Sequence, residues 1–308
     1  MKIDYNKLIK ELVESKNVKI SCLIPAYNEA HRISPVLEIV KNYPNFCEVV
    51  VVDDGSKDST AGEVQAFCDK YSNIRLIKLK KNGGKTEAVK IGVEECKGEL
   101  IALIDADLKG LSHEYLSKMC YLVADAEYSM TILDRGGDRM SPIGWFAFFP
   151  RLMGGERAFW KKDFQKIEFD ADTGYGLEFV MNLWYIKMGL KVRTVFCPKL
   201  AGAYQFKKKG LFFGLIAYAR MTKEVYKKSN LRNIFLQVKE VEEDRLEMLY
   251  NLYNKTRFKT IISIVILIAS ILTAFGTFFI LHGRYNVIGK IPNPKNNRLV
   301  KKFRGQSK

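Results

Sequence analysis

The sequence has 308 residues, 47% of them hydrophobic, so it is long enough for one substantial core with an appendage and too apolar for a disordered chain. Its formal net charge of +16 is unevenly placed, because residues 1–200 carry +1 and residues 201–308 carry +15. No zinc-finger, RNP-like or helix-turn-helix motif accompanies this basic excess, so we predict no nucleic-acid partner and assign the charge to an anionic membrane surface.

The six cysteines are scattered, without a C-x-x-C pair, and several lie within apolar runs. This pattern favours free thiols in a reducing compartment over a disulfide framework or a zinc site. The first 19 residues are too polar for a secretory signal. We therefore expect the bulk of the protein in the cytoplasm.

Strands and helices are predicted to alternate after a short helix at about residues 4–15. The strands are nearly continuous apolar runs, and the segments between them have helical spacing, including one that contains Pro35. This alternation predicts an α/β fold with a mostly parallel sheet and helices on both faces. The predicted strands are 18–25, 47–56, 73–80 and 99–107, and the predicted helices between them are 29–43, 59–71 and 83–98.

Beyond about residue 125 this pattern loosens. Residues 134–164 are rich in glycine and aromatic residues, which is more typical of substrate loops than of framework. Residues 174–189 begin after glycine and have the spacing of an amphipathic helix, and a short strand is predicted near 191–197.

Acidic residues follow three of the predicted strands, at the carboxyl ends where parallel sheets bind ligands; the first of them is Glu29. Asp105 and Asp107 have D-x-D spacing, which suits Mg²⁺ or Mn²⁺ bridging to phosphate oxygens, because magnesium needs only one or two protein carboxylates. A solvated turn is the alternative. Of Asp53 and Asp54, one can bind a ribose or base while the other caps a turn or helix, and we assign Asp54 to the ligand.

The sequence NGGK at 82–85 supplies flexible backbone followed by a lysine at a helix start. Its backbone N–H groups and Lys85 could meet a diphosphate, and the alternative is a plain turn and helix cap. It is not a Walker loop, which requires G-x-x-x-x-G-K-[ST].

Four motifs, in this order, resemble those of the family 2 glycosyltransferases, whose nucleotide-sugar-binding fold is called GT-A. They are LIPAYNEA (23–30), VVVDDGSKDST (50–60), KNGGKTEAVKIGVEECKGELIALIDADL (81–108) and GYGLE (174–178). The resemblance covers roughly residues 18–205. It implies inversion at the anomeric carbon by direct displacement, with Mg²⁺ or Mn²⁺ stabilising the departing nucleotide diphosphate.

The resemblance also implies roles for individual residues. Those that would line the nucleotide pocket or contact the nucleoside are Pro25, Ala26, Tyr27, Glu29, Val52 and Asp54, and Lys85 keeps the diphosphate assigned to it from its place in NGGK. Those that would hold the metal and the sugar diphosphate are Asp105, Ala106 and Asp107, with Asp105 and Asp107 as metal ligands and Asp107 as a catalytic residue. Many relatives place a histidine near the metal further along, but residues 201–209 contain none, so no third protein ligand is assigned.

Glu178, in GYGLE, is the candidate general base for an acceptor hydroxyl. A helix cap or structural acid is the alternative, and an acceptor that is already an ionised phosphate would need no base. Arg135 and Arg157 are candidate contacts for the acceptor or for phosphate, with solvated loop arginines as the alternative.

The C-terminal third predicts attachment to a membrane. Residues 207–229 alternate basic clusters with bulky apolar residues, as an interfacial helix does, although a helix packed on the protein is the alternative. Residues 261–281 are uncharged and, as a helix, long enough to cross a bilayer core of ~30 Å. A single crossing would place the tail, 284–308, outside the cytoplasm, although it holds eight basic residues and the positive-inside rule favours the cytoplasm for such a tail. Either segment 261–281 is therefore re-entrant, or the basic residues of 207–259 determine the orientation in spite of the tail.

Five regions are therefore predicted. They are an N-terminal helix (1–17), a GT-A catalytic domain (18–205), amphipathic membrane-interface helices (206–257), a transmembrane segment (258–283) and a basic tail (284–308).

With its predicted interfacial helices and hydrophobic anchor, the chain resembles the members of the family that act on lipids, such as polyprenyl-phosphate sugar synthases and glycolipid synthases. We thus predict a metal-dependent, inverting hexosyltransferase that moves a sugar from a UDP- or GDP-sugar to polyprenyl phosphate or a diacylglycerol-type glycolipid at the cytoplasmic face of the cell membrane. A soluble or saccharide acceptor and an inactive scaffold subunit are the alternatives, and a homo-oligomer is open. A single predicted span and the lack of a QxxRW motif disfavour a processive polymerase.

Overall fold

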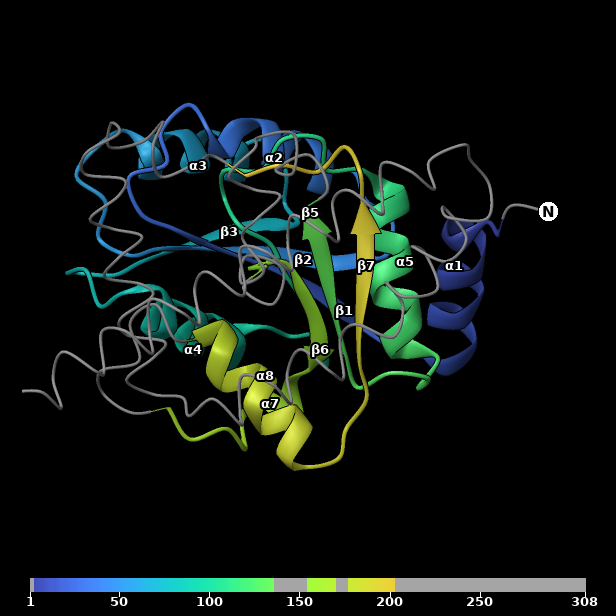
Figure 1. Cartoon of the computed structure of the whole chain (residues 1–308). Coiled ribbons are helices and arrows are strands. Elements are labelled where there is room, and N and C mark those ends of the chain that lie inside the picture. Colours follow the sequence, from blue (N-terminus) through green and yellow to red (C-terminus); the bar gives the residue numbers. More distant parts are fainter. Residues whose placement is uncertain (1–2, 136–153, 170–176, 203–308) are drawn as a thin grey trace, which may run out of the picture. The chain divides into compact units, whose positions relative to one another are not determined.

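A seven-stranded sheet runs through the part of the chain that the computed structural model describes, which is residues 3–135, 154–169 and 177–202 (Figure 1). The strand order is β3-β2-β1-β4-β6-β5-β7. The four strands predicted in the first half of the chain are confirmed, and they pair in parallel. They are β1 (Ile20–Ala26), β2 (Phe46–Asp53), β3 (Ile74–Lys78) and β4 (Leu100–Leu103).

The second half of the sheet contains an antiparallel strand that the sequence did not predict. β6 (Arg157–Trp160) lies between β4 and β5 (Met130–Arg135) and is antiparallel to both. The expectation that residues 134–164 form substrate loops is wrong at both ends of that range, because 134–135 belong to β5, 157–160 form β6 and 161–164 are helical, and Ala158 and Phe159 are fully buried in the sheet. The strand predicted near 191–197 is confirmed as β7 (Val192–Cys197), which pairs in parallel with β5.

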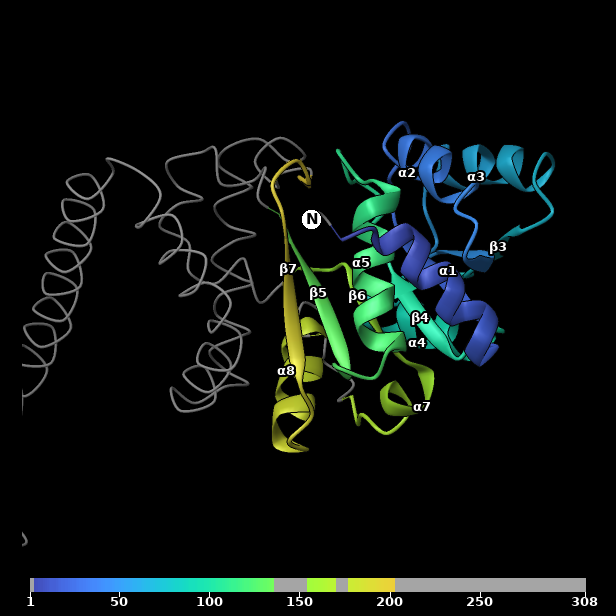
Figure 2. The same ribbon diagram turned by 90° about the vertical axis from the view of Figure 1, so that its right-hand side faces the viewer.

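Alternate residues of the strands enter two separate cores, one on each face of the sheet. In β1, Cys22 and Ile24 belong to the core beneath the first group of helices, and Leu23 belongs to the core beneath the second. The first group comprises α1 (Tyr5–Lys16), α2 (Ile33–Val40), α3 (Thr60–Cys68) and α5 (His113–Ala124). The second comprises α4 (Lys85–Glu95), α7 (Lys161–Phe164) and α8 (Leu177–Lys187), and Figure 2 shows the two groups on opposite sides of the strands.

Helix α2 begins later than the spacing of residues 29–43 predicts. Asn28 and His31 have positive φ values of 53° and 63°, so the chain turns before the helix can start. Pro35 is the third helical residue, where the missing N–H would have no partner within the helix, and it is therefore tolerated.

No helix among the described residues is long and apolar enough to cross a membrane. The predicted interface helices (206–257), transmembrane segment (258–283) and basic tail (284–308) all lie outside the described residues, as do residues 174–176 of GYGLE.

Candidate functional site

The loops after β1, β2 and β4 meet at one edge of the sheet. The register pairs Ala26 with Asp53, the N–H of Asp54 donates to Ala26 O at 2.9 Å, and the N–H of Ile104 donates to Leu23 O at 2.9 Å. Because the three strands are parallel, their carboxyl ends all open onto this edge. The acidic residues that follow them therefore gather, as the sequence predicts.

A cleft of about 690 Å³ opens beside the ends of β1, β2 and β3. It combines an aromatic ring, Tyr27, with the carboxylate of Asp53 and a basic rim, and the Tyr27 side chain is 40% exposed. An aromatic face and ammonium groups suit a base and phosphates, respectively. The lining residues are Tyr27, Asp53, Gly55, Ser56, Lys57, Ala61, Lys78, Leu79, Lys80, Lys81 and Asn82.

The other residues predicted around the nucleotide are placed differently. Pro25 and Ala26 belong to β1, and Ala26 is buried. The carboxylate of Glu29 accepts a hydrogen bond from Arg32 Nε at 2.5 Å. Val52 is fully buried in the core beneath α4, so its side chain faces apolar neighbours.

The two aspartates after β2 have separate partners. Asp53 lines the cleft and caps the DGS turn, accepting from the Ser56 N–H at 3.1 Å. Asp54 is only 2% exposed and accepts from the N–H groups of Gly83 at 2.7 Å and Gly84 at 2.8 Å. Burial raises the pKa of Asp54, and these two amides oppose that rise. In this structure Asp54 therefore shapes the loop that precedes Lys85, and its predicted contact with the ligand stays a prediction.

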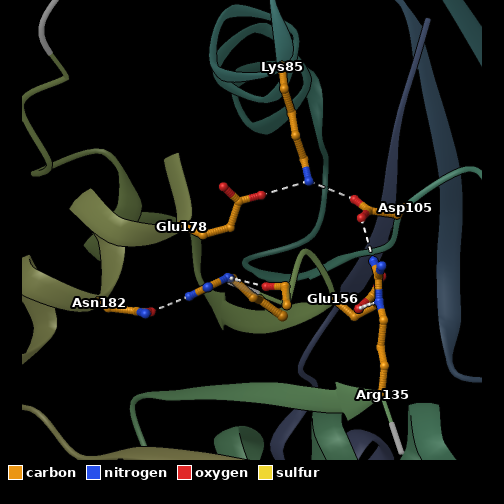
Figure 3. A network of polar contacts seen from close by, with 8 residues as sticks. Lys85, Asp105, Arg135, Glu156, Glu178 and Asn182 are labelled. Atoms are coloured by element: carbon orange, nitrogen blue, oxygen red, sulfur yellow. Dashed lines mark hydrogen bonds and ion pairs between the residues drawn. The ribbon is translucent and has the colours of Figure 1, made fainter. Parts of the chain in front are cut away.

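Lys85 bonds to two acids, Asp105 after β4 and Glu178 on α8 (Figure 3). It is the first residue of α4, and Gly84, with φ of 87°, caps that helix. The Lys85 ammonium donates to Asp105 Oδ1 at 2.7 Å and to Glu178 Oε1 at 2.8 Å. Glu178 lies in the first turn of α8 and is 7% exposed.

Arg135, at the end of β5, approaches Asp105 from the other side. Its Nη2 donates to Asp105 Oδ2 at 2.6 Å, and its Nε donates to Glu156 Oε2 at 2.9 Å. Burial opposes ionisation of Asp105, but Lys85 and Arg135 together hold the pKa of that carboxyl well below its usual range. Glu156 carries no motif in the sequence, so sequence reasoning missed it.

Arg157 lies on strand β6 and is fully buried, so its interpretation as a solvated loop arginine is wrong. It donates to Gly154 O at 3.0 Å and to Asn182 Oδ1 at 2.5 Å, and burial lowers its pKa to about 10. Asn182 was also missed, although it stands four residues after Glu178 on the same face of α8, and a polar pair on a buried helix face is a usable signal.

The chemistry of Asp105 and Asp107 fits a hard divalent cation. Asp107 is partly buried, and its charge, together with those of Glu156 and Asp105, raises the pKa of Arg135 although burial opposes this. Ala106 between them is buried in the core. No three His, Cys, Asp or Glu side chains among the described residues group closely enough to hold a metal. Magnesium needs only one or two protein carboxylates, because it keeps several waters and binds substrate phosphates.

Comparison with known proteins identifies a family for this arrangement. Residues 21–179 match Glycosyl transferase family 2. A dolichyl-phosphate beta-glucosyltransferase from Dictyostelium discoideum is 40% identical over 111 residues, which are 31% of this chain and 34% of that protein. A dodecaprenyl-phosphate galacturonate synthase from Rhizobium johnstonii is 31% identical over 99 residues, which are 30% of this chain and 29% of that protein. The chain thus matches about a third of the length of these curated relatives.

Solved structures match the fold over a longer stretch. Glucosyl-3-phosphoglycerate synthase from Mycobacterium tuberculosis, in complex with Mn²⁺, UDP and glucosyl-3-phosphoglycerate, has a TM-score of 0.57 and 19% identity, and the match covers 76% of this chain and 85% of that one. At this identity the likeness supports the fold alone, and it confirms the predicted α/β architecture.

Proposed function

Because this chain belongs to glycosyl transferase family 2 and is a glycosyltransferase, we propose that it moves a sugar from a UDP- or GDP-sugar to a membrane lipid, with inversion at the anomeric carbon. The acceptor we propose is a polyprenyl phosphate, because both curated relatives described above are named for polyprenyl-phosphate products or acceptors. A diacylglycerol-type glycolipid is the second lipid candidate. The observation that carries the proposal is the convergence of Lys85, Asp105, Arg135 and Glu178 at the carboxyl edge of the sheet.

On the donor side, the cleft beside β1–β3 would take the nucleoside, with Tyr27 against the base. The diphosphate would then lie toward the N-terminus of α4, where Lys85 and the backbone amides of that helix favour an anion. Asp107, with Asp105, would hold Mg²⁺ or Mn²⁺, which stabilises negative charge on the departing diphosphate when it is bound. The solved structural neighbour was obtained with Mn²⁺ and UDP, which supports the proposal that a divalent cation accompanies the nucleotide.

On the acceptor side, a phosphate group brings its own ionised nucleophile. The Glu178 carboxylate is paired with the Lys85 ammonium at 2.8 Å, so in this structure it positions Lys85. Arg135, at the end of β5, supplies a planar donor group of the kind that recognises phosphate. These features favour an acceptor phosphate over an acceptor hydroxyl.

Membrane attachment belongs to the same proposal. A lipid acceptor must be met at a bilayer surface, and residues 201–308 combine a +15 charge with the uncharged segment 261–281. We place the catalytic domain at the cytoplasmic face of the cell membrane and the anchor at 258–283.

A soluble phosphorylated acceptor is the second candidate. It is favoured by the solved neighbour, whose product is glucosyl-3-phosphoglycerate, and the same arginine could recognise its phosphate.

The test is transfer by membranes that contain the full chain. Radiolabelled UDP-glucose, GDP-mannose and related donors are supplied with Mg²⁺ or Mn²⁺ and with polyprenyl phosphate, and the lipid phase is extracted. Label should enter the lipid, and Asp107→Ala should reduce its rate about 100-fold, because a group that stabilises developing charge is lost. Asp69→Ala is the matched control, since Asp69 is an exposed aspartate at the end of α3.

Metal-dependent label in the aqueous phase would instead support the soluble acceptor. No transfer with any donor, or equal transfer by Asp107→Ala, would contradict the proposed reaction.

A further inference from the structure

Glu156 is a fully buried carboxylate just before β6, and two nitrogens of Arg135 bind it. Arg135 Nε donates to Glu156 Oε2 at 2.9 Å, and Arg135 Nη2 donates to Glu156 Oε1. The same Nη2 also donates to Asp105 Oδ2 at 2.6 Å, so one guanidinium nitrogen is shared between two carboxylates (Figure 3). Glu156 thus contacts the proposed donor site through Arg135.

The backbone around this pair leaves no spare room. A Cβ atom at Gly155 would lie 2.3 Å from Asp105 Oδ2, and one at Gly202 would lie 2.2 Å from Arg135 Nη1. Any other residue at either position would have to displace Asp105 or Arg135. Glycine at these two positions therefore lets Asp105 and Arg135 pack closely against the backbone.

The charges around Asp105 give a physical reason for the buried Glu156 carboxylate beside Arg135. Asp105 Oδ1 already accepts from Lys85 at 2.7 Å and Oδ2 accepts from Arg135. Each of these cations is shared with a second carboxylate, Lys85 with Glu178 and Arg135 with Glu156. Without Glu156, the positive charge of Arg135 would face Asp105 alone, and the site would attract a divalent cation less strongly.

We propose that Glu156 is a positioning residue that holds Arg135 and draws part of its charge away from Asp105, which keeps the acids after β4 attractive to the divalent cation that accompanies the donor. This inference rests on the proposed function, because it assumes that Asp105 and Asp107 meet a metal and a nucleotide diphosphate. Its effect is electrostatic, so changing Glu156 should alter metal and nucleotide binding in opposite directions.

The test measures binding of Mn²⁺ alone, and of UDP or GDP without metal, to the purified full chain. Glu156→Gln makes the site more positive, so its Mn²⁺ dissociation constant should rise about tenfold, while the nucleotide should bind more tightly. Arg135→Met should do the reverse, with tighter Mn²⁺ and weaker nucleotide binding. The double variant removes both charges, and it should return both constants to within about threefold of the wild type.

Glu48→Gln is the matched control. Glu48 is 4% exposed and paired with Arg75 Nε at 3.0 Å, but it lies at the opposite end of the strands. Its loss should lower stability and leave both binding constants unchanged.

Three outcomes would overturn the inference. Glu156→Gln could weaken metal and nucleotide binding together, it could change stability alone as Glu48→Gln does, or Arg135→Met could weaken Mn²⁺ binding; this last result counts even if Glu156→Gln does not fold. Wild-type protein that binds neither Mn²⁺ nor nucleotide would contradict the proposed function itself.

Discussion

Individual carboxylates in this protein lie in two kinds of surroundings. At the carboxyl edge of the sheet, Asp105 and Glu178 share Lys85, and Asp105 also pairs with Arg135, so within the described residues these acids are held by long charged side chains. At the opposite edge, Glu48 accepts from Ser21 Oγ at 2.7 Å, from Arg75 Nε and from a backbone N–H, so its bonds belong to the fold. The first set is suited to binding and the second to stability.

The shifted pKa of Glu48 predicts how the stability of the protein depends on pH. Burial opposes its ionisation, but the bonds from Ser21, the backbone N–H of Lys97 and Arg75 prevail and hold its pKa below the ordinary value of 4.5. A depressed pKa contributes stability that is present above the unfolded-state pKa and is lost as the pH falls below it. Glu48→Gln should therefore cost about 1.5–3 kcal/mol of unfolding free energy at pH 7, and the difference from the wild type should shrink below about pH 4.5.

Urea unfolding at pH 7, 5 and 3.5, followed by circular dichroism, measures this difference. A gap that stays constant or widens on acidification would show that the charge of Glu48 is not what stabilises the protein.

Some of these site residues can be predicted from the sequence and others cannot. Asp53, Asp54, Asp105 and Asp107 follow apolar strands, so their gathering at one edge can be predicted from periodicity alone. Glu156 cannot be predicted in this way, because its role depends on Arg135, which is 21 residues away in the chain and on another strand. Long-range partners also decide which of two adjacent aspartates faces the cleft.

At the scale of elements, length and apolar continuity decide what can be predicted. β1 and β2 are seven and eight residues long and nearly all buried, and the sequence predicts both. β4 and β6 have four residues each, but β4 lies in the apolar run 100–104, whereas β6 opens with Arg157 and has no such run. β6 becomes a strand because β4 and β5 supply hydrogen-bonding edges on both sides. Tertiary context therefore outweighs the local pattern there.

Two helical glycines give opposite predictions for the same substitution. A Cβ at Gly62 in α3 meets nothing within 4 Å, so Gly62→Ala should stabilise the protein by about 0.5–1 kcal/mol through helix propensity. A Cβ at Gly92 in α4 would lie 2.3 Å from Leu23 Cδ1 and 3.0 Å from Val52 Cγ2, and both neighbours are fully buried. Gly92→Ala should therefore destabilise by about 1–3 kcal/mol.

Thermal unfolding of the two variants and the wild type measures whether Gly62→Ala raises, and Gly92→Ala lowers, the melting temperature. Equal shifts in the same direction would contradict the close packing of α4 on β1.

At the scale of the whole molecule, charge and hydrophobicity divide the chain. The first 200 residues are nearly neutral and contain the sheet, and the last 108 carry the basic excess and the uncharged segment 261–281. This division predicts a catalytic domain brought to an anionic surface by the rest of the chain. The identities of the donor sugar and of the acceptor molecule, by contrast, leave no pattern in composition or periodicity, because a pocket selects them through shape and a few contacts.

The measurement that tests the central claim most directly is hydrogen exchange of the full chain with and without UDP or GDP and Mn²⁺. If the carboxyl edge of the sheet is the donor site, exchange should slow at residues 27–29, 53–56, 82–86 and 105–108, and it should not change at 45–48 or 97–99 at the opposite edge. Protection confined to the opposite edge, or none at nucleotide concentrations that saturate binding, would contradict the account.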